Sequence, residues 1–72
     1  MRKLNELKVG EEAVVIEMLA ENRRLRDIGL VIGTKVKCLF KSPLGNPVAY
    51  KITGAVIAIR KEDGEKIGIE VL

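Results

Sequence analysis

Apolar and polar residues alternate in short runs along the chain, and this pattern predicts a protein made mainly of β-strands. Successive side chains of a strand point to opposite faces, so a period of two marks a strand with one buried face. Five runs rich in Val, Ile, Leu or Ala fit such strands, at residues 13–18, 34–40, 48–53, 55–60 and 67–71.

The alternation assigns faces most clearly in the second run. Val36, Cys38 and Phe40 are predicted to point inward, while Lys35 and Lys37 point outward. In the fourth run, the inward positions are Ile57 and Ile59. Leu39 breaks the pattern on the lysine face of the second run.

One short helix is predicted between the first two strands. Asn22 is its expected N-cap, and Leu25 and Ile28 are three positions apart on its buried side. Gly29 should end the helix, because a residue just past a helix end often needs a left-handed backbone that glycine adopts without strain.

Glycine and proline mark the turns that follow. Gly33 is a turn glycine before the second strand, and Gly54 marks a bulge or tight corner between the third and fourth. The segment 42–47 contains two prolines and predicts a stiff loop with the apolar Leu44 at its tip. Residues 61–66 are charged and predict one helical turn before the last strand.

Five short strands and one helix in 72 residues predict a single domain, residues 1–72, folded as a small antiparallel barrel. A barrel fits this pattern better than a flat sheet, because closing the sheet removes unpaired edges. We expect an SH3-like barrel first and an OB-like barrel second, since the OB-like barrel usually needs a longer chain.

The composition argues against an enzyme and against a cofactor or metal site. The chain has no histidine, the commonest general base near neutral pH and the commonest transition-metal ligand. Ser42 is the only serine, and the dispersed glycines form no phosphate-binding loop. The single cysteine, Cys38, is expected to be a small buried hydrophobe.

The net charge of +3 is too small to indicate nucleic-acid binding by itself. Lys35, Lys37, Lys51 and Arg60 could supply cations, but only Tyr50 could offer an open ring for stacking against bases. No run of residues is long and apolar enough to cross a bilayer, and the first residues do not fit a signal peptide. We therefore expect a cytoplasmic protein.

Several segments, taken in order, resemble the FeoA family, the small cytosolic proteins of bacterial and archaeal ferrous iron uptake. The resemblance spans nearly the whole chain and is found in Leu7-Lys8-Val9-Gly10-Glu11, Asp27-Ile28-Gly29-Leu30, Gly33-Thr34, Pro43-Leu44-Gly45-Asn46-Pro47 and Ile57-Ala58-Ile59-Arg60. The same SH3-like module also resembles the C-terminal domain of metal-dependent repressors of the DtxR type.

The resemblance implies a partner, the FeoB-type membrane permease, whose cytosolic part includes a G-protein domain. The expected role is contact with that part of the permease, without tight iron binding. The predicted docking surface comprises Pro43, Leu44, Gly45, Asn46 and Pro47, flanked by Gly29, Leu30 and Arg24. An alternative is that Leu44 folds back onto the barrel and the loop is only a connector.

Two other functions stay open at this point: a nucleic-acid-binding barrel, and an accessory domain of a metal-dependent regulator. Salt dependence separates the first from apolar docking, because phosphate contacts weaken steeply with salt. A monomer or a weak dimer is expected.

Overall fold

A computed structural model describes residues 2–19 and 23–72, with the side chain of Arg24 excepted. The chain is mainly β, as predicted. Its elements in order are β1 (Arg2–Lys3), the 3-10 helix η1 (Leu4–Glu6), β2 (Glu12–Met18), α1 (Arg23–Asp27), β3 (Lys35–Lys41), β4 (Val48–Ile52), β5 (Ala55–Ile59), α2 (Lys61–Gly64) and β6 (Ile67–Val71).

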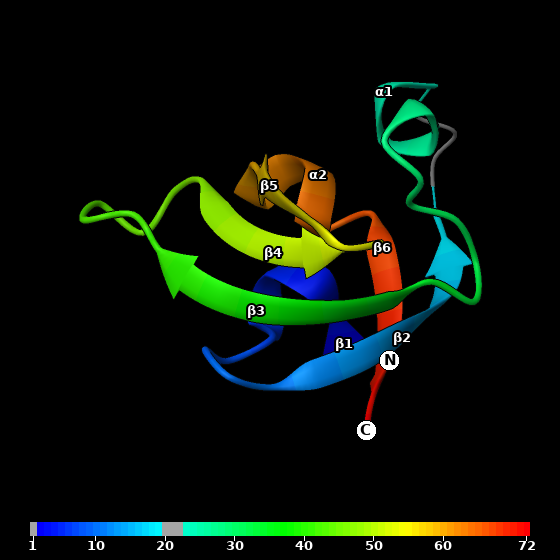
Figure 1. Ribbon diagram of the computed structural model, residues 1–72, viewed down its shortest axis with the longest axis horizontal. Helices are drawn as coiled ribbons and strands as arrows, with labels where there is room; N and C mark the ends of the chain where they lie inside the picture. The colour runs from blue at the N-terminus through cyan, green and yellow to red at the C-terminus, as the bar shows by residue number, and fades with distance from the viewer. Residues whose placement is uncertain (1, 20–22) are drawn as a thin grey trace.

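The strands form one antiparallel sheet in the order β1-β6-β2-β3-β4-β5, which curls around the core (Figure 1). All five predicted strands are present, and β1 is an additional strand of two residues that pairs with β6. Among the described residues, β1 and β5 pair on one side only. The curled sheet is therefore open at its edges and is not closed by strand pairing.

The core fills the inside of the curl with aliphatic side chains from nearly every element. Val36 and Cys38 of β3 point inward, as the alternation predicts, and Lys35 is exposed. Tyr50 on β4 is 1% exposed, and its hydroxyl donates a hydrogen bond of 3.1 Å to the Leu4 carbonyl oxygen. The buried cluster comprises Leu4, Leu7, Ala13, Val15, Leu25, Leu30, Val36, Cys38, Val48, Tyr50, Ile52, Ile59, Ile67 and Ile69.

The prediction that Phe40 points inward is wrong, because a β-bulge interrupts the alternation of β3. Cys38 pairs with Tyr50 and Phe40 pairs with Ala49, so Leu39 is the extra residue of the bulge. Phe40 is 58% exposed. The bulge thus turns the one aromatic ring outside the core toward solvent at the end of β3.

Helix α1 ends where the sequence predicts. Gly29 has a φ of +91°, in the left-handed region, and the Leu30 N–H donates to the Leu25 carbonyl oxygen at 3.0 Å. Leu25 is buried, and Ile28 packs against the core. The predicted N-cap, Asn22, lies outside the described residues.

A two-residue turn joins β4 and β5 at the predicted corner. Ile52 pairs with Ala55, and between them Thr53 and Gly54 have φ values of +52° and +81°. Positive φ at both central residues is the requirement of a type I′ hairpin turn. A β-branched residue such as Thr53 rarely adopts this conformation.

None of the helices in the described part of the chain is both long and apolar enough to span a membrane.

Candidate functional site

The loop between β3 and β4, residues 42–47, projects from one end of the molecule (Figure 1). The Gly45 N–H donates to the Ser42 carbonyl oxygen at 2.7 Å, and the Ser42 N–H donates to the Pro47 carbonyl oxygen at 3.2 Å. Gly45 has a φ of +82°. Two prolines and these internal hydrogen bonds give the loop a defined backbone.

Leu44 lies in this turn and is 95% exposed. The alternative that Leu44 folds back onto the barrel is therefore wrong. The Leu44 side chain is not part of the buried core. An apolar side chain left almost entirely in water on a rigid projection is available to a protein partner.

Asn46 has a structural role that the sequence did not reveal. Its side-chain Oδ1 accepts a hydrogen bond of 3.0 Å from the Lys61 N–H, at the start of α2. The first N–H groups of a helix lack partners within the helix, so this bond satisfies one of them. Asn46 therefore ties the base of the loop to α2.

Phe40 extends the apolar surface toward the loop and was not among the predicted site residues. It lies one residue before the end of β3, where the chain enters the loop, and its exposure follows from the bulge. Leu39, which breaks the alternation in the sequence, was the available signal for that bulge.

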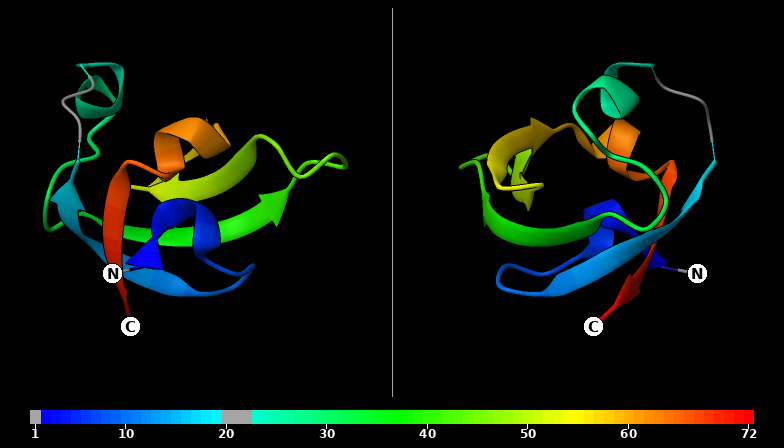
Figure 2. Two further views of the ribbon diagram at one scale, coloured as in Figure 1. Left: turned by 180° about the vertical axis from the view of Figure 1, so that it is seen from behind. Right: turned by 45° about the vertical axis from the view of Figure 1, so that its right-hand side comes forward.

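The predicted flanking residues lie elsewhere. Figures 1 and 2 place α1 and the turn that follows it at the opposite end of the long axis from the loop 42–47. Gly29 is in that turn, and the backbone of Arg24 is in α1. Leu30 is 0% exposed and belongs to the core, so its side chain cannot meet a partner, and its inclusion in the docking surface is wrong.

The polar groups that could do chemistry are mostly engaged in local contacts. Glu11 Oε1 accepts the Lys8 N–H at 2.8 Å and faces the Arg2 guanidinium at 3.4 Å. These two groups, the Lys8 N–H above all, hold the pKa of the Glu11 carboxyl below its ordinary value. Glu12 Oε2 pairs with Lys35 Nζ at 3.0 Å.

Burial removes the remaining candidates from the surface. Cys38 is buried, and desolvation raises the pKa of its thiol. Desolvation also raises the pKa of Tyr50 well above its ordinary value. Tyr50 therefore offers no open ring to a base. Within residues 2–19 and 23–72, no three His, Cys, Asp or Glu side chains are grouped as metal ligands.

The sequence was compared with known proteins. A curated relative, the Fe(2+) transport protein A/Fe(2+) transporter FeoB fusion protein of Porphyromonas gingivalis, is 30% identical over 73 residues. The match covers 97% of this chain, which spans only 9% of the length of that relative.

Solved structures share the fold over nearly the whole chain. The solution structure of the FeoA protein from Chlorobium tepidum is 40% identical, with a TM-score of 0.90, and the match covers 99% of this chain and 70% of that one. FeoA of Stenotrophomonas maltophilia, solved in complex with zinc and described as a prokaryotic SH3 domain protein, is 26% identical. Its TM-score is 0.83, with 97% of this chain and 91% of that chain covered.

These structures agree with the SH3-like fold expected from the sequence. The family model of the FeoA domain matches residues 2–71. This chain belongs to the FeoA family.

Proposed function

We propose that this chain is a small cytoplasmic accessory protein of ferrous iron uptake that binds the cytosolic part of a FeoB-type permease. It acts by contact, as neither an enzyme nor a cofactor carrier, and it reaches the membrane only through its partner. The contact surface is the loop 42–47, with Leu44 at its centre and Phe40 at its base.

The observation that carries this proposal is the fusion protein of Porphyromonas gingivalis. In that relative, a region 30% identical to this chain is part of the same polypeptide as a FeoB transporter. Covalent linkage keeps two domains at a high local concentration, which favours contact between them. A separate chain of the same family needs a binding surface to achieve the same association.

The loop supports the proposal by its shape and exposure. Leu44 is almost wholly exposed, while the loop backbone is fixed by its own hydrogen bonds and by the Asn46 contact to α2. A rigid loop loses little conformational entropy on binding, so more of the contact energy is available for affinity. Burying one leucine side chain on a partner contributes about 1.5–3 kcal/mol.

The test is direct binding between this protein and the purified FeoB-type permease of the same organism, in detergent, with and without guanine nucleotide. Saturable binding that the separated cytosolic region of the permease reproduces supports the proposal. Absence of binding in every nucleotide state would exclude a stable contact.

The structure does not favour nucleic-acid binding. Nucleic-acid binding required Tyr50 as an exposed stacking ring, and Tyr50 is buried.

A further inference from the structure

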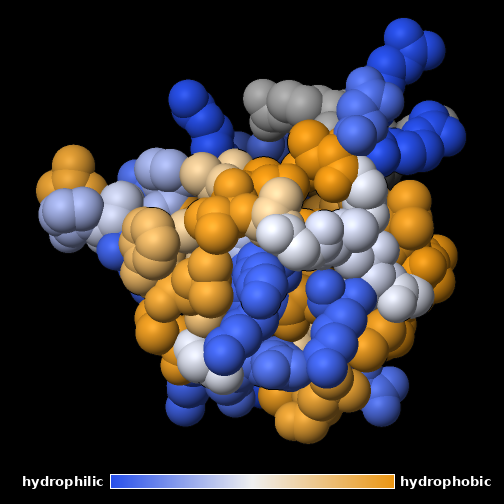
Figure 3. Space-filling view, in the orientation of Figure 1, coloured by the Kyte–Doolittle hydropathy of each residue, from blue (hydrophilic) through white to orange (hydrophobic). Residues whose placement is uncertain are grey.

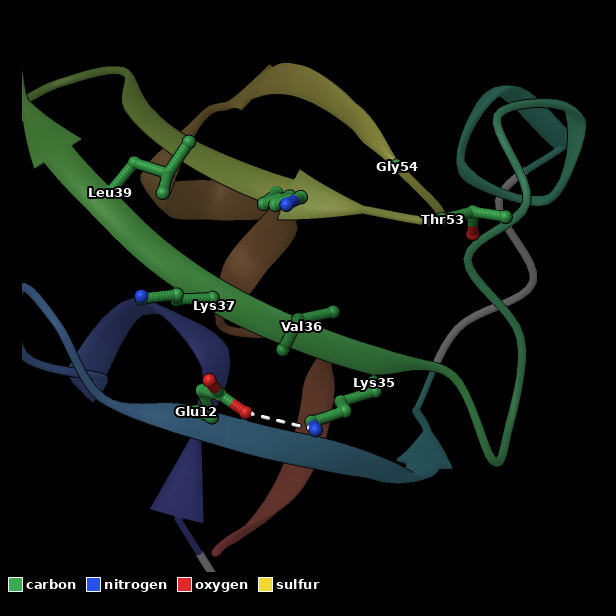
Figure 4. Close-up of a pocket in the computed structure, with 8 residues that line it drawn as sticks. Glu12, Lys35, Val36, Lys37, Leu39, Thr53 and Gly54 are labelled. Carbon is green, nitrogen blue, oxygen red and sulfur yellow. Dashed lines mark ion pairs between the residues drawn. The ribbon is translucent and has the colours of Figure 1, made fainter.

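A groove of about 450 Å³ lies on the outer face of the sheet, across β2, β3 and β4 (Figure 4). Three lysines and one carboxylate supply its charged groups. The lining residues are Glu12, Lys35, Val36, Lys37, Leu39, Lys51, Thr53 and Gly54. Figure 3 shows the corresponding hydrophilic area at the centre of this face, with hydrophobic atoms around it.

The strand register places two of these lysines directly opposite one another. Lys37 of β3 pairs with Lys51 of β4, and Glu12 of β2 pairs with Lys37 on its other side. Like charges directly opposite each other on neighbouring strands are destabilising. The free protein therefore contains an unfavourable pair between β3 and β4, close to the bulge at Leu39.

The single carboxylate of the groove makes its ion pair with the third lysine and not with that pair. Glu12 is engaged with Lys35, at 3.0 Å, diagonally across the two strands. In the part of the chain that the structure describes, neither Lys37 nor Lys51 has a carboxylate within ion-pair distance. Lys35 first, and Lys37 and Lys51 to a smaller extent, lower the pKa of the Glu12 carboxyl.

The groove and the proposed contact surface lie along the same strand, β3. Leu39 lines the groove, and its neighbour Phe40 leads into the loop that presents Leu44. Figure 4 shows the groove along β3, and Figure 1 shows the loop 42–47 projecting from the end of that strand. A partner bound at the loop can therefore extend a segment along β3 into the groove.

We propose that the groove binds an acidic segment of the same protein partner, a proposal that rests on the proposed function. Lys37 and Lys51 are the residues that bind the carboxylates of this segment. Carboxylates of that segment would form ion pairs with Lys37 and Lys51, while Leu39 and the lysine methylenes contact its apolar atoms. Such charge complementarity guides association and fixes the register of the complex.

Nucleic acid fits the groove less well. Single-stranded nucleic acid is held by aromatic stacking as well as by cations. The buried Tyr50 is unavailable, and the exposed Phe40 does not line the groove. Glu12 also places a negative charge among the lysines, which opposes a dense polyphosphate more than it opposes spaced carboxylates.

The first experiment uses the isolated protein and does not depend on the permease. Hexaglutamate, hexaglutamine and tripolyphosphate are each titrated into 15N-labelled protein, and amide shifts are followed by NMR. The proposal expects shifts in β3 and β4 with hexaglutamate and none with hexaglutamine. Shifts elsewhere, no saturable shifts, or tighter binding of tripolyphosphate than of hexaglutamate would overturn it.

Variants then test the residues. Lys37→Gln/Lys51→Gln should weaken hexaglutamate binding about fivefold, the effect of two exposed ion pairs. The same variant should have an unchanged or higher urea midpoint, because the repulsive pair is gone.

Lys61→Gln/Lys66→Gln removes the same charge outside the groove and should change affinity less than twofold. Glu12→Gln should tighten binding. Equal weakening by the two lysine double variants, or weaker binding by Glu12→Gln, would overturn the proposal.

The permease assay separates this inference from the proposed function. If the permease binds and Lys37→Gln/Lys51→Gln binds it as tightly as the parent protein, the groove proposal is wrong while the proposed function stands. If the permease does not bind at all, the proposed function fails and the hexaglutamate result still decides whether the groove recognises carboxylates.

Discussion

The hydroxyl of Tyr50 donates its hydrogen bond to the carbonyl oxygen of Leu4, 46 residues away in the chain, across the interior of the curled sheet. Leu4 begins η1, just after edge strand β1, and Tyr50 belongs to β4, beside the opposite edge strand β5. The bond therefore joins the two ends of a sheet that strand pairing leaves open. Burial of both residues completes the core.

Replacing this hydroxyl should destabilise the fold. Tyr50→Phe removes this hydrogen bond, while the Leu4 carbonyl oxygen keeps the bond of 3.1 Å that it accepts from the Leu7 N–H. The loss of one such bond should cost about 0.5–1.5 kcal/mol. Urea unfolding followed by circular dichroism measures the change. The exposed Phe40→Leu variant is the control and should change the free energy of unfolding by less than about 0.5 kcal/mol. Equal stability of Tyr50→Phe and the parent protein would show that the bond does not hold the sheet closed.

Stability should fall at alkaline pH. Burial raises the pKa of Tyr50 and of Cys38 in the folded protein, so the unfolded chain loses those protons first. The stabilisation that these two protonated groups contribute is fully present below their unfolded pKa values, about 8.5 for Cys and about 10 for Tyr. It is lost as pH rises through the higher pKa values of the folded protein. Urea midpoints between pH 7 and pH 11 should therefore decrease, less steeply for Cys38→Ala than for the parent. A flat profile contradicts this.

Much of the fold could be predicted because alternation is a local signal. The five main strands and the end of α1 at Gly29 follow from residues close together in the sequence. Strand β1 could not be predicted, because two residues show no period, and its pairing with β6 is set by distant contacts. The roles of Tyr50 and Phe40 also escaped prediction, since one depends on Leu4 and the other on a bulge in β3.

For the candidate site as well, local features could be predicted from the sequence and long-range ones could not. Proline and glycine flank Leu44 closely, so its place on a stiff loop could be read from the sequence, and the structure adds that the side chain is exposed. The sequence could not show that Leu30 is in the core or that α1 and the loop lie at opposite ends. Those facts depend on how the sheet curls in three dimensions.

The hairpin turn between β4 and β5 offers a stabilising substitution. Thr53 adopts a φ of +52°, which costs a β-branched residue more than it costs asparagine. Thr53→Asn gives the Asn-Gly pair that type I′ turns favour, and should raise the free energy of unfolding by about 0.5–1 kcal/mol. Thermal unfolding measures this, and Thr53→Val, which keeps the branch, should bring no gain. A lower melting temperature for Thr53→Asn would mean that the threonine hydroxyl stabilises the turn.

At acidic pH, Glu11 should contribute to the loss of stability. The Lys8 N–H lowers the pKa of its carboxyl, so the stabilisation is present above the unfolded pKa of about 4.3 and is lost as pH falls through the lower folded value. Glu11→Gln should therefore show a shallower decline in urea midpoint between pH 5 and pH 2 than the parent protein. Glu65→Gln, an exposed carboxylate on another turn, is the control and should follow the parent profile.

The central claim is that an exposed leucine on a rigid loop makes the contact with the permease. The most direct test is the affinity of Leu44→Asp for the FeoB-type permease, measured beside its urea midpoint. The matched control is Ile32→Asp, which charges another exposed apolar residue, 65% exposed, in the segment between α1 and β3 at the opposite end of the molecule. The account predicts that both variants keep the stability of the parent protein. Leu44→Asp should bind the permease at least tenfold more weakly, a loss of about 1.4 kcal/mol per factor of ten. Ile32→Asp should bind it like the parent. Parent-like binding by a folded Leu44→Asp variant would contradict it.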